Sequence, residues 1–210
     1  EFFPNAVMET GHDILFPWVS RMIMLSLYGE DRVPFKDVYL HGLVLDPHGQ
    51  KMSKSKGNVV NPQEIMQEFG SDALRMGLIT SRSAGQNQAF GRDKVIAGRN
   101  FANKLWNMAR YIESATFEST KNQTTNSKET TKSEILPTTN YQLPTSITPA
   151  DHWVVRELDA AANQVAELLE EYRFAEAFET VYHTVWDKMA DWYLEASKTA
   201  PNASVMIWAL

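Results

Sequence analysis

The 210-residue chain contains no cysteine. A disulfide scaffold and a zinc site with cysteine ligands are therefore excluded. The chain also lacks an apolar run of the roughly 20 residues that a membrane helix needs. Its first residues, EFFPNAVMET, lack the basic-then-apolar order of a signal peptide. We expect a soluble, cytoplasmic protein with no membrane partner.

Positive charge is also scarce, with 20 basic against 26 acidic residues and a formal net charge of −6. This balance argues against a protein that coats nucleic acid non-specifically, but it permits local basic patches. Hydrophobic residues make up 43% of the chain, enough for the cores of one or two domains.

Basic charge is concentrated in residues 51–58, KMSKSKGN, which place three lysines within six residues. Cations on a loop of small residues suggest a mobile and strongly anionic ligand, with phosphate first among the candidates. The alternative is a solvated surface loop, and the surrounding sequence has to decide between the two.

Residues 1–90 alternate strand and helix signals. A short strand is predicted at residues 6–9 and a helix over residues 13–28, with Ile14, Trp18, Met22 and Leu25 on one stripe. Residues 38–45, VYLHGLVL, are typical of a buried parallel strand. Two short helices are predicted to begin near Asn61 and Ser71. The result is an incomplete α/β unit, and a lone opening strand indicates a fragment.

Residues 91–210 have helical periodicity, and their apolar and aromatic stripes predict the core of a helical bundle. The stripes are Val95, Ala102, Leu105, Ala109 and Ile112; then Trp153, Leu158, Ala162, Val165, Leu169 and Tyr172; then Phe174, Phe178, Val181, Val185, Met189 and Trp192. Residues 116–147 are rich in Thr, Ser, Asn and Lys and are predicted to form a disordered insertion.

Two further features could join the lysine loop at one site, because ligands of open α/β sheets bind at the carboxyl ends of the strands. His41 and Gly42 lie in the apolar run, where glycine lets a flat ligand approach the backbone. Gly11 and Asp13 lie at a strand-to-helix turn, where an acidic side chain can hold ribose hydroxyls. Adenine at residues 41–44, ribose at Asp13 and phosphates at the lysines indicate ATP. A buried, hydrogen-bonded histidine is the alternative for His41.

The five letters KMSKS are the signature loop of class I aminoacyl-tRNA synthetases. The wider blocks ETGHDILFPWVSRMIM, HGLVLDPHGQKMSKSKGNVVNP, SDALR and GRNFANKLWNMARYI resemble the valyl-tRNA synthetase family. The block YRFAEAFETVYHTVWDKMADWYLEASK is similar to the helical anticodon-binding domain of that family. The resemblance covers nearly the whole chain except residues 116–147.

The resemblance implies a fold and an activity. Residues 1–90 would be the second half of a Rossmann-like nucleotide-binding domain, and residues 91–210 an antiparallel, all-α anticodon-binding domain. The activity would be the ATP-dependent attachment of L-valine to its tRNA through valyl-adenylate, a step of protein biosynthesis. Mg²⁺ would enter with the nucleotide, and no metal-ligating residues are assigned.

The resemblance also implies roles for individual residues. Lys51 and Lys54 would clamp the triphosphate while the carboxylate of valine attacks the α-phosphorus, and Lys56 and the serines would shape the loop. Ile14 and Trp18 would contact the valine side chain, with helix–sheet packing as the alternative. The residues assigned to ATP are Gly11, Asp13, His41, Gly42, Val44, Met52 and Ser53.

The first bundle helix would carry the tRNA contacts Lys104, Asn107 and Tyr111, which lie on one face. An exposed Tyr111 could stack on an unpaired anticodon base. The alternative is that Tyr111 packs at the rim of the bundle.

Some features of the family are missing from this sequence. It has no HIGH-type segment and no editing domain, and it carries Gly85-Gln86-Asn87 where the family usually has Gly-Gln-Asp. We therefore expect a fragment that is inactive without the amino-terminal half of the synthetase. The alternatives are a non-catalytic tRNA-binding module, an isoleucine-specific enzyme, which RNFANKLWN and Ile14 disfavour, and a helical scaffold without a ligand.

Overall fold

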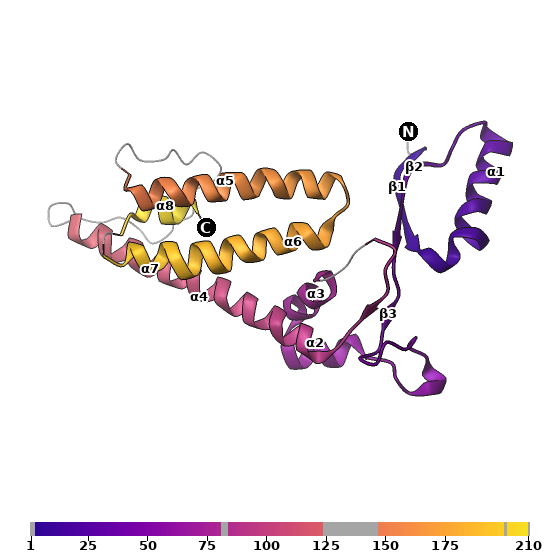
Figure 1. Ribbon diagram of the computed structural model, residues 1–210, viewed down its shortest axis with the longest axis horizontal. Helices are drawn as coiled ribbons and strands as arrows, with labels where there is room; N and C mark the ends of the chain where they lie inside the picture. Colours follow the sequence, from indigo (N-terminus) through magenta and orange to yellow (C-terminus); the bar gives the residue numbers. More distant parts are fainter. Residues whose placement is uncertain (1–2, 81–83, 124–146, 200, 210) are drawn as a thin grey trace. The chain divides into compact units, whose positions relative to one another are not determined.

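The computed structural model describes residues 3–80, 84–123, 147–199 and 201–209 (Figure 1). The chain divides into two compact units. The first unit comprises Glu1–Arg99 and Glu167–Phe178, and the second unit comprises Asn100–Ala166 and Glu179–Leu210. The described helices include none that is long and apolar enough to cross a membrane.

A parallel pair of strands organises the start of the first unit. Strand β1 (Asn5–Gly11) pairs with β2 (Phe35–His41), so that Gly11 lies opposite His41. The parallel pairing confirms the prediction from the apolar run. The prediction that this run is fully buried is wrong, since Val38 is 37% exposed. In the described part of the chain β2 pairs with β1 alone, so one edge of β2 has no strand partner there.

The predicted single strand over residues 38–45 is divided in two. Strand β2 ends at His41, and β3 (Val44–Leu45) pairs with a different strand, β4 (Gln88–Ala89). The break lies at Gly42, where a Cβ atom would be 1.6 Å from the carbonyl oxygen of Gln86. The backbone of the β4 segment therefore passes directly against Gly42, and only glycine fits there.

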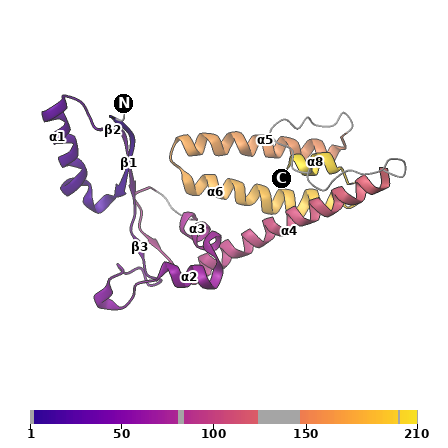
Figure 2. The ribbon, with the colours of Figure 1, turned by 180° about the vertical axis from the view of Figure 1, so that it is seen from behind.

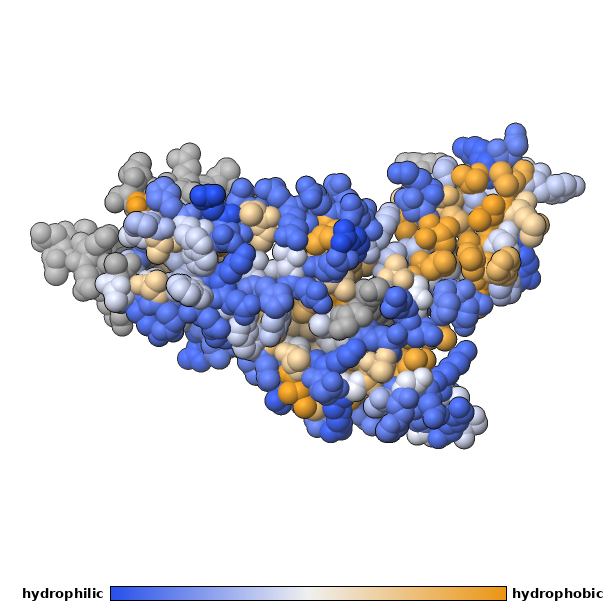
Figure 3. Space-filling view, viewed as in Figure 1, coloured by the Kyte–Doolittle hydropathy of each residue, from blue (hydrophilic) through white to orange (hydrophobic). Residues whose placement is uncertain are grey.

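The helix predicted over residues 13–28 begins with two irregular turns. A 3₁₀ turn η1 (His12–Ile14) and a π-helical turn η2 (Leu15–Val19) precede α1 (Ser20–Glu30). The wider π turn changes the helical register, so Val19 is fully buried and Trp18 is 44% exposed. Leu25, which we predicted to lie on the same packed stripe, is 71% exposed. Figure 3 shows apolar residues gathered on the surface over α1 and the neighbouring strands.

A small core forms where the remaining helices of the first unit meet β3 and β4. Helices α2 (Pro62–Phe69) and α3 (Ser71–Ile79) begin where the sequence predicts. Asn61 Oδ1 caps α2 by accepting the Gln63 N–H at 3.0 Å, and Gly70 ends it with a φ of 91°. The buried members of this core are Ile65, Ala73, Leu74, Phe90 and Val95.

The second unit is built from helices around one hydrophobic cluster. The elements that contribute to it are α4 (Arg92–Gln123), α5 (Pro149–Glu170), a π-helical segment η4 (Thr184–Tyr193), α7 (Leu194–Ser197) and α8 (Ala203–Trp208). Helix α6 (Phe174–His183) precedes η4. Helices α5 and α6 lie side by side in both views (Figure 2). The buried residues of the cluster are Met108, Ile112, Val154, Met189, Ala190, Tyr193, Leu194, Val205 and Met206.

The π-helical segment also explains an error in the predicted core. The stripe read at ordinary helical spacing places Trp192 inside, but Trp192 is 72% exposed and Tyr193 is 1% exposed. A π turn holds more residues than an α turn, so the buried position moves along the sequence by one residue. Met189, on the same stripe, is buried as predicted.

The start of α5 is held by a buried carboxylate. Thr148 and Asp151 form a reciprocal capping box, in which the Thr148 N–H donates to Asp151 Oδ2 at 2.8 Å and the Asp151 N–H donates to Thr148 Oγ1 at 3.2 Å. Asp151 also accepts hydrogen bonds from the Tyr193 hydroxyl (2.7 Å) and from Asn202 Nδ2 (3.0 Å). This one side chain therefore ties α5 to η4 and to the start of α8.

The segment predicted to be a disordered insertion is only partly described. Helix α4 continues to Gln123, eight residues into that segment. At its other end Ile147 packs against the hydrophobic cluster of the second unit. The rest of the predicted insertion, residues 124–146, lies outside the described residues.

Candidate functional site

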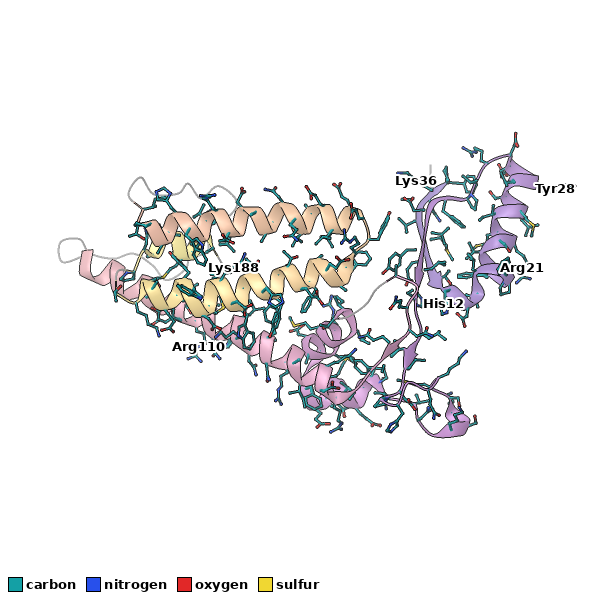
Figure 4. The ribbon with its side chains drawn as sticks, in the orientation of Figure 1. His12, Arg21, Tyr28, Lys36, Arg110 and Lys188 are labelled. Atoms are coloured by element: carbon teal, nitrogen blue, oxygen red, sulfur yellow. The ribbon has the colours of Figure 1, made fainter. Side chains whose placement is uncertain are left out.

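The carboxyl ends of β1 and β2 bring three of the predicted nucleotide residues together. Gly11 lies opposite His41 in the parallel register. A Cβ atom on Gly11 would be 2.7 Å from Asp13 Oδ1 and 3.6 Å from the His41 ring. Glycine at this position therefore leaves the space in which the Asp13 carboxylate and the imidazole approach the strand end. His12, between Gly11 and Asp13, is labelled in Figure 4.

His41 lies between two acceptors. Its Nδ1 is 3.0 Å from the Gly42 carbonyl oxygen, and its Nε2 is 3.4 Å from Glu9 Oε1. The ring is half-buried, so it is neither the fully buried histidine of the alternative reading nor free of partners. The sequence analysis does not predict a role for Glu9. The signal was available, because alternation along β1 places residues 9 and 11 on one face.

The base of the lysine loop is closed by Asp46 and Asn58. The buried Asp46 accepts backbone N–H groups of His48 (3.0 Å) and Gln50 (2.8 Å) through Oδ1, and Asn58 Nδ2 (2.8 Å) through Oδ2. These bonds, with that from Gln50 the largest, lower the pKa of Asp46 below its usual value. Asn58 Oδ1 in turn accepts the Ser53 N–H at 2.9 Å. Neither residue is predicted from the sequence, although Asp-Pro-His-Gly is a turn signal.

The tip of the loop is a short 3₁₀ turn, η3 (Lys54–Lys56). Ser53 caps it by accepting the Lys56 N–H at 3.3 Å, and Gly57 ends it with a φ of 66°. The side chains of Lys54 and Lys56 are exposed, and Met52 is half-buried. The turn therefore presents ammonium groups to solvent, while the Ser53 hydroxyl shapes the loop.

Lys51 connects the loop with the strand ends. Its Nζ lies 3.9 Å from Asp13 Oδ2, and both side chains are well exposed. The backbone of Lys51 also forms an isolated antiparallel bridge with Leu45, which fixes the position of the Lys51 backbone beside β3. Exposed ion pairs contribute little to stability, so this pair matters more for where it places the charges.

Two of the residues assigned to adenine are engaged by the chain itself. Gly42 is required by the close approach of Gln86, and Val44 pairs with Gln88 and packs against the first-unit core. The Leu43 N–H donates to Asn87 Oδ1 at 2.8 Å. At this position asparagine supplies the same acceptor oxygen as aspartate, which explains why the change from Gly-Gln-Asp is compatible with the fold.

The two residues assigned to the valine side chain lie in different turns. Ile14 ends η1 and Trp18 belongs to η2, so the expected one-turn spacing on a regular helix is wrong. Ile14 is 38% and Trp18 44% exposed. Their exposure argues against the alternative of ordinary helix–sheet packing.

The predicted tRNA face on α4 is less exposed than expected. Lys104 Nζ lies 2.9 Å from Asp191 Oδ1 and 5.2 Å from the centre of the Trp186 ring. Tyr111 is half-buried and packs against the second-unit cluster, so the prediction that it is exposed is wrong. Asn107 is exposed. Lys188 of η4, which is labelled in Figure 4, forms an ion pair with Glu157 of α5.

A cavity of about 330 Å³ in the first unit is lined by Pro47, Asn87, Gln88, Ala89, Gly91, Asp93 and Lys94. None of the residues assigned to the nucleotide lines this cavity. The candidate nucleotide site consists of the carboxyl ends of β1 and β2 with the lysine loop beside them. The described ranges contain no group of three or more His, Asp or Glu side chains that could hold a metal ion.

Comparison with known sequences assigns both parts of the chain. Residues 1–90 match the family of class I tRNA synthetases (I, L, M and V), and residues 151–210 match the anticodon-binding domain of tRNA ligases. The valine–tRNA ligase of Dehalococcoides mccartyi is 38% identical over 94% of this chain, and that of Geobacillus kaustophilus is 41% identical over 94%. The chain spans about a fifth of the length of these curated relatives.

Solved structures show the same fold. A leucyl enzyme of Agrobacterium radiobacter, in a ternary complex with tRNA, superposes with a TM-score of 0.74 at 20% identity, over 98% of this chain and 24% of that one. The methionyl-tRNA synthetase of Mycobacterium tuberculosis, in complex with methionyl-adenylate, gives 0.69 at 20% identity, over 99% and 39%. At such low identity the likeness concerns the fold alone.

Proposed function

From the premise that the chain is a homologue of the valine–tRNA ligases among the class I tRNA synthetases, we propose that it takes part in the attachment of valine to tRNA. Its share is the lysine-loop part of the ATP site and the first part of the anticodon-binding domain. The observation that carries the proposal is the ion pair between Lys51 and Asp13. It joins the basic loop to the carboxylate at the end of a parallel strand pair, which is where α/β sheets bind nucleotides.

The proposed reaction is the formation of valyl-adenylate. A carboxylate oxygen of valine attacks the α-phosphorus of ATP, the bond to the β-phosphate oxygen breaks, and its electron pair leaves with pyrophosphate. Lys51 and Lys54 stabilise the negative charge that spreads over the phosphate oxygens. Asp13 and Gly11 bind the ribose, and Lys51 exchanges its carboxylate partner for phosphate. Mg²⁺ would enter on the phosphate oxygens of ATP.

His41 would make the main contact with adenine, because Gly42 already packs against the Gln86 backbone and Val44 already pairs with Gln88. Both ring nitrogens of His41 already face acceptors, so the free surface of the ring is its face. A flat base can stack on that face without displacing either contact. Ile14 and Trp18 remain available to the valine side chain because they are exposed.

The second unit would bind the anticodon part of the valine tRNA. Asn107 is an exposed donor and acceptor on α4, and Lys104 lies one turn before it. Tyr111 packs against the core, so we assign to it only the exposed part of its ring as a stacking surface. Recognition of unpaired bases by such side chains is the usual mode for single-stranded RNA loops.

A polypeptide limited to these 210 residues would not activate valine. The sequence carries the lysine loop but no HIGH-type segment to hold the phosphates from the opposite side. Correct placement of reacting groups can be worth about 7–11 kcal/mol, so the rate should fall below detection when one side is missing. Valine-dependent exchange between ATP and pyrophosphate by the purified chain would contradict this.

The central test is Lys54→Ala in a full-length synthetase that carries this segment. Single-turnover adenylate formation should slow by about a hundredfold or more, as expected for the loss of one charge-stabilising group. Lys56→Ala, from the same turn, is the matched control and should change the rate only a few-fold. Equal effects of the two variants would remove Lys54 from the mechanism. If the exchange between ATP and pyrophosphate depends on isoleucine instead of valine, the enzyme is isoleucine-specific.

A further inference from the structure

The connection between α5 and α6 belongs to the first unit, with the nucleotide strands. Its residue Tyr172 has a φ of 59°, in the left-handed region. A bulky side chain is uncommon there, because the conformation favours glycine, and it persists only where its surroundings hold it. The side chain of Tyr172 must therefore make contacts that glycine could not.

Those contacts are with strand β2. The Tyr172 hydroxyl donates to Asp37 Oδ2 at 3.3 Å, across 135 residues of sequence. Its ring centroid lies 6.0 Å from that of Tyr39, and the Phe174 ring meets Tyr39 edge-on at 5.5 Å. Partial burial and the Asp37 carboxylate raise the pKa of Tyr172, so the phenol stays protonated and donates.

The same face of β2 leads directly to the candidate nucleotide site. Asp37, Tyr39 and His41 are alternate residues of one strand, so their side chains lie on one face. Tyr39 also lies opposite Glu9 in the parallel register, and Glu9 is the residue that faces His41 Nε2. The contact of the α5–α6 connection is thus two residues along the strand from the imidazole.

We propose that Tyr172 is a positioning residue for the nucleotide site: with Phe174 it clamps Asp37 and Tyr39, and so fixes the end of β2 from which His41 contacts the nucleotide. Within the described residues β2 pairs with β1 alone, and Tyr172 and Phe174 add their contacts with Asp37 and Tyr39 to that pairing. This proposal rests on the proposed function, since His41 must contact ATP for its position to matter.

The informative substitution is Tyr172→Gly, because it separates the turn from the clamp. Glycine suits a φ of 59°, so the turn between the helices is retained while both the ring and the hydroxyl are lost. In a full-length synthetase carrying this segment, the KM for ATP should rise three- to tenfold in exchange assays, with kcat nearly unchanged. Tyr172→Phe keeps the ring contacts and should restore most of the affinity.

Two controls make the result specific. Glu170→Ala changes an exposed residue at the same end of α5 and should leave the KM for ATP unchanged. In a His41→Ala background Tyr172→Gly should have no further effect, because the residue through which it acts is gone. If the KM rises equally in both backgrounds, Tyr172 does not act through His41 and the proposal is wrong.

A second measurement is independent of activity. Amide hydrogen exchange of residues 35–41 in the 210-residue chain should be at least several-fold faster in Tyr172→Gly than in the parent. Faster amide hydrogen exchange with an unchanged KM for ATP would make the clamp purely structural and overturn the positioning role. Unchanged amide hydrogen exchange would overturn the clamp itself. If the parent synthetase shows no valine-dependent exchange between ATP and pyrophosphate, it is the proposed function that fails, and the amide hydrogen exchange still tests the clamp.

Discussion

Asp151→Ala should strongly destabilise the second unit. Asp151 is 2% exposed and accepts hydrogen bonds from Thr148, Tyr193 and Asn202. Its removal leaves the hydroxyl of Tyr193, which is 1% exposed, without its acceptor, and it opens the cap of α5. A hydrogen bond to a charged group is worth about 1.5–3 kcal/mol, and a lost cap costs about 1 kcal/mol.

These contributions share one carboxylate and are not additive, so we expect Asp151→Ala to lower the free energy of unfolding by about 3–5 kcal/mol. That is a large part of the roughly 5–15 kcal/mol that stabilises an ordinary domain. Tyr193→Phe removes only the hydroxyl and should cost less than Asp151→Ala. Asp159→Ala, an exposed acidic residue further along the same helix, is the matched control and should change stability by less than about 0.5 kcal/mol.

Stability should also depend on pH through Asp151. Burial alone would raise its pKa, but the hydrogen bonds from Thr148, Tyr193 and Asn202 outweigh burial and lower the pKa below its ordinary 3.8. A carboxyl group with a lowered folded-state pKa stabilises the fold above its unfolded-state value, and this contribution is lost as the pH falls through the folded-state value. The difference between the parent and Asp151→Asn should therefore be full at pH 7 and shrink below a pH of about 3.8.

The assay is urea unfolding of the 210-residue chain followed by far-ultraviolet circular dichroism, at neutral pH and at several values below 4. A loss of less than about 1 kcal/mol for Asp151→Ala would refute the reasoning, because it would show that the Tyr193 hydroxyl and the helix end find other partners at little cost. A difference between parent and Asp151→Asn that persists unchanged at low pH would refute the assignment of the pH effect to this carboxylate.

Three further predictions concern the strand break and the tRNA face. Gly42→Ala should destabilise the first unit by at least about 3 kcal/mol in the same unfolding assay, because its Cβ would overlap the Gln86 carbonyl. The control is Gly29→Ala, in open space on α1, which should be neutral or stabilising by up to about 1 kcal/mol. If Lys104 contacts a phosphate, Lys104→Ala in the full-length enzyme should lower the salt slope of tRNA binding by about one. Tyr111→Ala should weaken binding by about 1–3 kcal/mol at every salt concentration. Identical binding isotherms across a salt series would place the tRNA contacts elsewhere.

Features set by neighbouring residues were predictable from the sequence. The caps at Asn61 and Thr148 act on N–H groups two and three residues away, so their helices begin where the letters indicate. The KMSKS letters, together with the other sequence blocks, likewise pointed to the family, and the structure adds that Ser53 caps the turn that presents the lysines and that Asp46 and Asn58 close the base of the loop. Such signals are local, and tertiary packing does not move them.

Features set by distant residues were decided by the tertiary structure. The run VYLHGLVL reads as one strand until the backbone of Gln86, 44 residues later, passes against Gly42. Trp192 reads as core at a spacing of 3.6 residues, but a π turn buries Tyr193 in its place. A π turn likewise buries Val19 beside the exposed Trp18. The sequence identifies Asp151 as part of a helix start, but only the tertiary structure buries it and brings Tyr193 and Asn202 within hydrogen-bonding distance of its carboxylate. The physical reason is the same in each case: burial and backbone approach depend on which segments meet, and that information is spread over the whole chain.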